Sequence, residues 1–518
     1  MSASLDVLFI NPGDTRKIYQ HLSNSFSAIE PPVFAATFAT FLRKKGCSVA
    51  IFDMPAEGRS TKEVAEVAIM LKPLLVVIAV YGFQPSASSQ NMPATREICN
   101  NIKALNSEIK ILLTGTHPAA LPMKTLTEES IDFVCDGEGP ITIHEVVQAL
   151  KVGDGDWSKV RGLWYWGGVH PFKMVRSNVS APLVENVDEE MPGLAWDLLP
   201  MGKYRAHNWH CNYGDMVSRM PYASILTSFG CPFRCEFCCI QAPFKSGERV
   251  MGYKSEVNSY RLRSLEAVMK EIHCVVQVYG IKNIKIHDEM FVLHPKHVLG
   301  IAEAIKDRYG DSLNIWAYAR IDTTKPVFLD ALRSAGFKWL GIGIESGSAH
   351  VREGADKSFS DNDIRKVCER VKSAGINIGG NFIFGLPDDT HETMNETFAL
   401  ALEIMPEMAN FYSAMAYPGS RLHSWARERG WPLPEDVDKG GPGWIGYSQH
   451  SRETFPLRTE KVDACDVLKR RDSAFIEYYT NPSYLRMVDS IFGKNAVSHI
   501  KEMTSLPSLK RVLFEKKD

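Results

Sequence analysis

Short apolar runs alternate with amphipathic stretches of helical length along most of this 518-residue chain. In the first 150 residues the apolar runs lie at 7–10, 49–52, 75–80, 109–113 and 133–135, with helical patterns between most of them. Strands separated by helices of this length form parallel sheets, because each helix carries the chain back across one face of the sheet. The pattern therefore predicts a doubly wound α/β domain over residues 1–150, with ligands above the carboxyl ends of its strands.

The same alternation returns with longer units from about residue 216 to residue 435. Six apolar runs are followed by helical patterns, and six repeats of this kind predict a partial (β/α)6 barrel. The expected strands are 223–227, 284–286, 315–317, 339–344, 378–384 and 410–416. Residues 151–215 are irregular and rich in tryptophan, which favours a connector packed against both domains. Residues 436–518 show helical patterns near 460–479 and 484–491 and are expected to cap the barrel.

Composition narrows the class of protein. The 59 Lys and Arg residues nearly balance the 61 Asp and Glu residues, so no overall field favours a nucleic acid or an anionic membrane surface. The longest apolar run, 74–83, is half of the ~20 residues that span a bilayer, so no membrane span is expected. No secretion signal is visible, and the 11 cysteines do not form a disulfide framework. We therefore expect a cytoplasmic protein with a small-molecule substrate.

Three cysteines lie close together in a short segment after the first strand of the second block. Cys231, Cys235 and Cys238 have the spacing C-x3-C-x2-C and follow an apolar, β-branched run. A closed zinc site or a closed iron-sulfur site needs a fourth ligand, and no Cys or His follows at a recognisable spacing. Three thiolates on a four-iron cluster would leave one iron open. A zinc knuckle or an incidental cysteine cluster is the alternative. Cys239 would point the opposite way and is expected to pack.

This loop, with Phe237 just before the last cysteine, resembles the signature of the radical S-adenosylmethionine (SAM) enzymes. The resemblance implies a [4Fe-4S] cluster bound by Cys231, Cys235 and Cys238. In such enzymes SAM chelates the open iron through its amino and carboxylate groups. It also implies an electron donor such as flavodoxin or ferredoxin, and it extends over the whole predicted barrel.

Further matches to this family suggest residues that contact SAM. Asp288 follows the second barrel strand, where an acidic side chain can accept charge-assisted bonds from the SAM amino group; capping of the next turn is the alternative. Glu345 and Ser346 end a segment that resembles the family's fourth strand. Arg320, beyond the third strand, is a candidate for the SAM carboxylate, and Phe237 for an apolar wall near the cluster.

The loops of the first domain resemble those of the cobalamin-binding domain that precedes the radical core in one large radical-SAM class. They carry Asn11, Tyr81, Gly115, Gly137 and Glu138, and the resemblance implies cobalamin contacts for these residues. A ligand-free Rossmann-like domain is the alternative. The Asp-x-His-x-x-Gly motif that supplies a lower axial histidine in cobalamin mutases is absent from residues 1–150. His117 is therefore expected to shape the cavity rather than to bind cobalt.

The combined resemblance implies a cobalamin-dependent radical SAM enzyme of the methyltransferase-like class. The expected reaction transfers a methyl group to an unactivated carbon of a small biosynthetic intermediate. A cobalamin-dependent radical cyclase or oxidase, similar to the anaerobic enzyme of chlorophyll synthesis, remains an alternative within enzymes. A non-catalytic cobalamin or redox sensor is the alternative from another class. A tRNA-modifying enzyme is less favoured, because the additional N-terminal cysteines and the C-terminal β-barrel of such enzymes are not visible.

Overall fold

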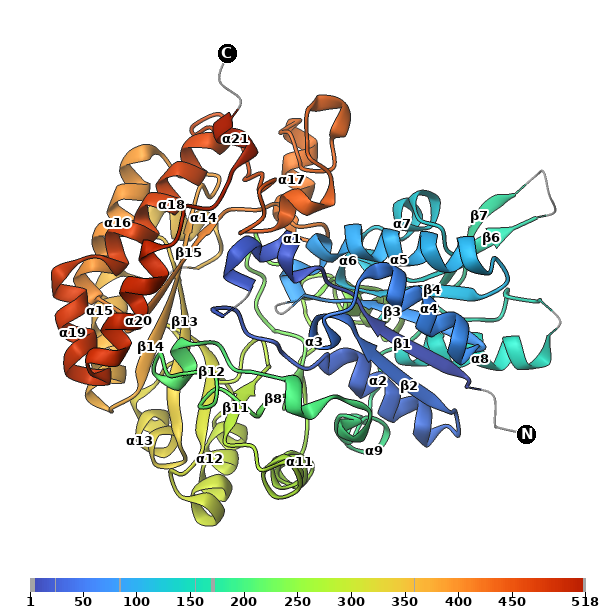
Figure 1. Cartoon of the computed structure of the whole chain (residues 1–518), viewed down its shortest axis with the longest axis horizontal. Coiled ribbons are helices and arrows are strands. Elements are labelled where there is room, and N and C mark those ends of the chain that lie inside the picture. The colour runs from blue at the N-terminus through green and yellow to red at the C-terminus, as the bar shows by residue number, and fades with distance from the viewer. Residues whose placement is uncertain are drawn as a thin grey trace.

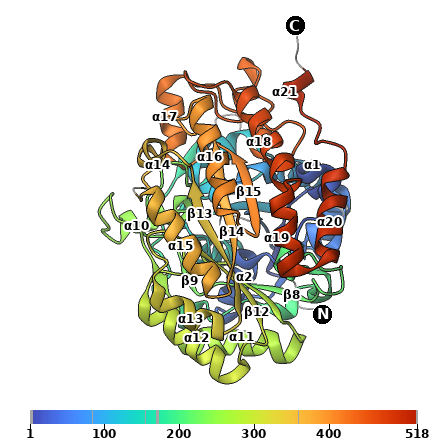
Figure 2. The ribbon, with the colours of Figure 1, turned by 90° about the vertical axis from the view of Figure 1, so that its left-hand side faces the viewer.

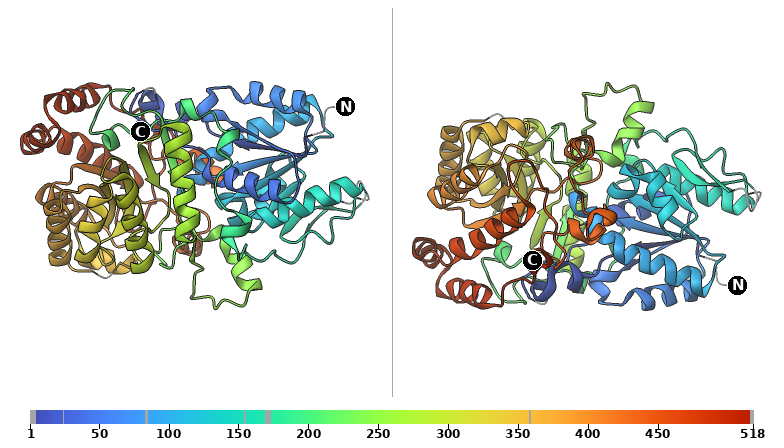
Figure 3. Two further views of the ribbon diagram at one scale, coloured as in Figure 1. Left: turned by 90° about the horizontal axis from the view of Figure 1, so that it is seen from below. Right: turned by 90° about the horizontal axis from the view of Figure 1, so that it is seen from above.

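The computed structural model describes residues 5–23, 25–82, 85–153, 155–168, 173–357 and 359–515, without the side chains of 85–87. Two α/β domains lie side by side, and helices of the C-terminal region cover one end of the second (Figures 1 and 3). None of the helices in these ranges is long and apolar enough to cross a membrane.

The first domain is built on a seven-stranded sheet of order β2-β1-β3-β4-β5-β6-β7. Strands β1 to β5 are parallel: Val7–Asn11, Val49–Asp53, Leu75–Val80, Lys110–Gly115 and Phe133–Cys135. The central strand β3 is buried at all six positions, as expected for a parallel strand covered on both faces. Helices α2 (Val33–Lys44) and α8 (Pro140–Val152) pack on one face, and α4 (Thr61–Leu71) and α5 (Met92–Leu105) on the other. The predicted doubly wound domain is confirmed.

The prediction that residues 151–215 are irregular is wrong for their first part. Strands β6 (Leu163–Gly167) and β7 (Met174–Ser177) form a hairpin that pairs antiparallel with β5 and makes the sheet mixed. The tryptophans of β6 lie on its more exposed face, and this alternating burial is that of a strand with one covered face. The remainder runs through short helices α9 (Val187–Glu190), η3 (Trp196–Leu198), η4 (Met201–Lys203) and η5 (Trp209–Cys211) between the two domains.

The second domain is a six-stranded parallel sheet of order β15-β14-β13-β12-β11-β8, which confirms the partial barrel. Its strands are Tyr222–Ile225 (β8), Asn283–Ile286 (β11), Asn314–Arg320 (β12), Phe337–Glu345 (β13), Asn377–Phe384 (β14) and Met408–Ser413 (β15). The helices between them are α11 (Leu265–Tyr279), α12 (Pro295–Tyr309), α13 (Pro326–Ser334), α14 (Ala349–Gly354), α15 (Asp361–Ser373) and α16 (His391–Ile404). Ser264, Ser360 and Thr390 cap α11, α15 and α16 through their side-chain oxygens.

After the barrel, α17 (Arg421–Arg429) lies at its mouth, and α18 (Ala464–Tyr479), α19 (Pro482–Phe492) and α20 (Lys494–Ser505) lie along its β15 side (Figure 2). The sequence reading missed α20. The buried Tyr478 and Tyr484 bond to carbonyl oxygens of Pro406 and Glu407 before β15, which fixes these helices to the barrel. The C-terminal residues then return over the cavity mouth and end in α21 (Val512–Glu515).

Candidate functional site

The three cysteines lie in a loop that follows β8 and the short strand β9 (Ser228–Phe229). The loop begins at Gly230, whose φ is +84°; a Cβ there would lie 2.4 Å from the carbonyl oxygen of Ser259. Only glycine fits this close approach without strain. The loop therefore starts at the carboxyl end of the first barrel strand, as the sequence predicts.

Two side chains that the sequence reading did not single out hold this loop. Gln241 Oε1 accepts the backbone N–H of Cys231 at 3.1 Å, and Asn258 Nδ2 donates to the carbonyl oxygen of Cys231 at 3.0 Å. Gln241 is itself bonded to the buried Glu248, which also accepts from Ser259. No sequence spacing signals these residues, because their role arises when α10 (Ala242–Val250) and the chain after it fold back on the loop.

The thiols are near enough to affect one another. Burial raises the pKa of Cys231 to about 12 and that of Cys238 well above its usual value, and each is raised further by its neighbouring cysteines and by Glu289. The guanidinium of Arg320 lies across the Phe233 ring at 3.9 Å and donates to Cys235 Sγ at 3.2 Å. Its other nitrogens are paired with Asp322. The raised pKa values keep the thiols of Cys231 and Cys238 protonated in the absence of a metal, and a bound metal ion would deprotonate them.

The donor set fits an iron-sulfur cluster. Three thiols on one tight loop, with a cation at the second, suit an anionic inorganic group. Among the described residues, no three His, Cys, Asp or Glu side chains converge as ligands of a single metal ion. A four-iron cube does not require such convergence, because each thiolate binds a different iron.

A cavity of about 490 Å³ opens from the cysteine loop. Phe237 and Cys238 line it at one end, and Glu30 and Gln90 of the first domain line its side. A smaller cavity lined by Asn11 and Tyr81 lies between the strand ends of the first domain and His287. The carboxyl ends of the two sheets therefore face a shared space.

The two acidic residues after β11, Asp288 and Glu289, lie in different environments. Both carboxylate oxygens of Asp288 accept bonds from Thr227 and Ser228, including the backbone N–H of Thr227 at 2.6 Å, and Asp288 does not line the cavity. Asp288 therefore bonds back to the chain after β8, and its contact with SAM stays a prediction. Glu289 lines the cavity instead, and burial raises its pKa to about 7. Of the two acidic residues, Glu289 is therefore the one that lines the large cavity.

Glu345 lies on the cavity wall in a backbone conformation with φ of +67°, and its contact with SAM stays a prediction. Its carboxylate is paired with the buried ammonium of Lys357, which the sequence reading missed. Ser346 is not among the residues that line the cavity, and its hydroxyl bonds to Thr397 Oγ1 at 3.1 Å and to the backbone N–H of Ser348. Its contact with SAM stays a prediction. Phe237 and Arg320 line the cavity near the cysteines.

At the strand ends of the first domain, Asn11 donates to Asp53 Oδ1 at 2.8 Å, and the Tyr81 ring stacks on Phe34 at 4.1 Å. Gly115 has φ of +131°, and a Cβ there would lie 2.2 Å from the carbonyl oxygen of Val80. Beside it, the buried hydroxyl of Thr116 has no hydrogen-bond partner among the described residues. An unpaired buried hydroxyl at this edge fits a polar cofactor that would satisfy it.

Gly137 and Glu138 lie after β5. The Gly137 N–H is bonded to Cys135 Sγ. Glu138 accepts the backbone N–H of Val184 at 2.9 Å and pairs with Arg261 at 2.7 Å, across the boundary between the domains. The carboxylate is thus engaged in joining the two domains, and its contact with cobalamin stays a prediction.

Both α/β domains match known protein families. Residues 22–147 match the family model described as B12 binding domain, and residues 225–401 match the one described as Radical SAM superfamily. An uncharacterized methyltransferase of Pyrococcus horikoshii is 30% identical, over 76% of this chain and 78% of the relative. The chain belongs to the cobalamin-dependent radical SAM enzymes. Its cofactors are accordingly a [4Fe-4S] cluster, SAM and cobalamin.

Two further proteins are similar to this chain over nearly its whole length. The anaerobic magnesium-protoporphyrin IX monomethyl ester cyclase of Rubrivivax gelatinosus is 23% identical, over 93% of this chain and 78% of the relative. The structure of the methyltransferase TsrM from Kitasatospora setae, with cobalamin and a [4Fe-4S] cluster bound, has a TM-score of 0.64 at 17% identity and covers 93% of this chain and 90% of that chain. The second likeness shows the fold.

His117 lies in α6 (Thr116–Ala120), the short helix that follows β4. Its Nδ1 is 2.8 Å from Ser89 Oγ, and its ring meets Trp444 edge-on at 4.5 Å. Burial lowers its pKa to about 3, so it stays neutral. His117 is not among the residues that line the two cavities described above, and its role in the cofactor site stays a prediction.

Proposed function

We propose that the enzyme transfers a methyl group to an unactivated carbon of a small molecule held between its two domains. The observation that carries this proposal is the single cavity lined by Phe237 and Cys238 of the cysteine loop and by Glu30 and Gln90 of the first domain. A substrate there meets both cofactor sites. The 30% identical methyltransferase supports methyl transfer as the outcome.

When bound, the cluster and SAM supply one-electron removal of hydrogen from carbon, and cobalamin supplies the methyl group. The protein holds and shields these groups. The Lys357–Glu345 pair and Arg320 fix the polar wall beside the cysteine loop. Glu30 joins the first domain to the barrel through Lys285, at 3.0 Å. Closure of this boundary excludes water from the reacting carbon. An electron donor of the flavodoxin or ferredoxin kind would supply the reductant.

Methyl-labelled SAM tests the proposal. Reduced enzyme is incubated anaerobically with a small-molecule extract, and labelled products are sought by mass spectrometry against the Cys231→Ala variant. We expect a product that carries the label, together with 5′-deoxyadenosine and S-adenosylhomocysteine in equal amounts. Label found solely in SAM and methionine, alongside a new unmethylated product, would contradict methyl transfer.

That second result would favour a radical cyclase or oxidase. The likeness to the anaerobic cyclase of Rubrivivax gelatinosus over 93% of this chain supports this alternative. Such a reaction would form 5′-deoxyadenosine without S-adenosylhomocysteine, so the ratio of these two products separates the two candidates.

A further inference from the structure

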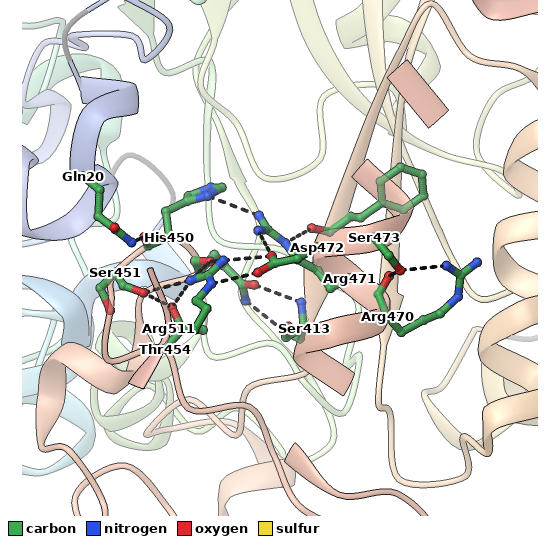
Figure 4. A network of polar contacts seen from close by, with 12 residues as sticks. Gln20, Ser413, His450, Ser451, Thr454, Arg470, Arg471, Asp472, Ser473 and Arg511 are labelled. Carbon is green, nitrogen blue, oxygen red and sulfur yellow. Dashed lines mark hydrogen bonds and ion pairs between the residues drawn. The ribbon is translucent and has the colours of Figure 1, made fainter. Parts of the chain in front are cut away.

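The wall of the large cavity opposite the cysteine loop is built by the C-terminal region. It contains α18, the turn around Gln449 and His450, and the returning segment Leu506–Leu509. Figure 4 shows the polar network that joins these segments to the end of β15. None of the matched family motifs reaches this wall, because the radical SAM match ends at residue 401.

Two arginines share one carboxylate in this network. Asp472 accepts from Arg471 Nη1 at 2.7 Å and from Arg511 Nε at 2.9 Å, and both arginines are buried. The Nδ1 atom of His450 accepts from Arg471 Nη2 at 3.2 Å. Burial lowers the pKa of His450 well below its usual value, so His450 is neutral and adds no charge. The network therefore carries one uncompensated positive charge.

Of the other charged groups on the cavity wall, Glu289 lies beside the cysteines and raises the pKa of Cys231 and Cys238, and the remainder are paired. Glu30 pairs with Lys285, and Glu345 pairs with Lys357. Arg320 is paired with Asp322 and lies beside the cysteines. Within the described part of the chain, the positive excess on this wall away from the cysteines is thus at Arg471. A buried, unmatched cation is costly unless an anion joins it.

Unused hydrogen-bond donors lie at the same place. A guanidinium has five N–H groups, and three of those of Arg471 donate to described partners: Phe411 O, Asp472 and His450. Ser413, at the end of β15, is 2% exposed and lines the cavity, yet its hydroxyl has no partner among the described residues. Gln449 holds the backbone of Ser413 on both sides, at 2.9 Å each, and so fixes that hydroxyl in place.

We propose that Arg471 and Ser413 bind an oxyanion of the substrate, a carboxylate or a phosphate, at the end of the cavity away from the cluster. Aromatic rings of Trp209, Trp316, Phe411 and Phe475 line the space between and suit an apolar, planar body. Arg511 is a positioning residue, because it orients Asp472 and ties the C-terminal segment to the wall. This inference rests on the proposed function, since it assigns a substrate class to the same cavity.

Binding of matched probes to the anaerobic holoenzyme tests the proposal without requiring turnover. The probes are 2-naphthoate, 2-naphthyl phosphate and the neutral 2-naphthamide, measured by calorimetry. Charge-assisted hydrogen bonds are stronger than neutral ones, so at least one acid should bind about tenfold or more tightly than the amide. The tighter acid identifies the oxyanion.

Arg471→Gln should abolish the preference for the acid and leave amide binding unchanged. Ser413→Ala should weaken binding of the acid several-fold. If Arg471→Gln fails to fold, the result with Ser413→Ala tests the proposal. Arg470→Gln is the matched control, because Arg470 lies over Phe398 outside the cavity. Equal binding of all three probes, no binding of any, or an acid preference that survives these substitutions would overturn the proposal. Because no SAM is consumed, these results stand apart from the success or failure of methyl transfer.

Discussion

At the scale of the residue, the site depends on which cysteines point to the cluster. Cys231, Cys235 and Cys238 share one loop, and Cys239 is buried beside them. Alanine at any of the three loop positions should remove most iron and sulfide, because two thiolates hold a cube poorly. Cys239→Ala should retain both. Iron and sulfide analysis of anaerobically reconstituted protein measures this, and a Cys239→Ala variant as depleted as Cys231→Ala would contradict the assignment.

Asp53 gives the second prediction at this scale. It accepts bonds from Asn11 and from Tyr204 Oη at 2.9 Å, and burial raises its pKa from 3.8 to about 6. A carboxyl whose pKa is raised in the folded state stabilises the protein below its unfolded pKa and loses that contribution as pH rises toward 6. Relative to Asp53→Asn, the wild type should therefore lose about 2–3 kcal/mol between pH 4 and pH 7.

Melting temperatures of both proteins across this range check the sign. Asp311→Asn, at an exposed position, serves as the control. A difference between wild type and Asp53→Asn that stays constant with pH would exclude a titrating Asp53.

At the scale of the element, an ion pair joins the β5 loop of the first domain to β10 (Arg261–Leu262) of the second. Arg261 and Glu138 are both nearly buried, and breaking such a pair from one side costs about 3–5 kcal/mol. Arg261→Met should lower the melting temperature and speed hydrogen exchange at the Val184 amide, whose acceptor is Glu138.

Replacing both partners with Met should recover much of that loss, since no lone charge is then buried. The control is Arg249→Met, at an exposed position. Unchanged exchange at Val184 in Arg261→Met would show that the pair does not hold the two domains together.

Helices and strands could be predicted from the sequence where the apolar residues follow a single pattern, that of a helix or that of a strand. The buried run of β3 has the predicted bounds, 75–80, because a fully apolar strand is a local signal. The β6–β7 hairpin was not predicted, since its pairing with β5 is a tertiary contact. The same holds in the site: Cys238 is visible from spacing, whereas Lys357 is brought to Glu345 only by folding.

At the scale of the whole molecule, the two α/β domains face one another with the carboxyl ends of their strands toward a common cavity, and the C-terminal region covers its far end (Figures 1 and 2). The arrangement follows from the alternation in the sequence, because parallel strands place all their variable loops at one edge. What the sequence could not supply is the polarity of the far wall, where residues distant in the chain such as Ser413, Arg471 and Arg511 meet.

The central claim is that three thiolates leave one iron of the cluster free to bind SAM. The direct measurement is electron-nuclear double resonance on the reduced enzyme with SAM isotopically labelled at its amino nitrogen. The account predicts a strong hyperfine coupling from that nitrogen to the cluster. A fully assembled cluster whose spectrum shows no coupling to the labelled nitrogen of bound SAM would contradict it.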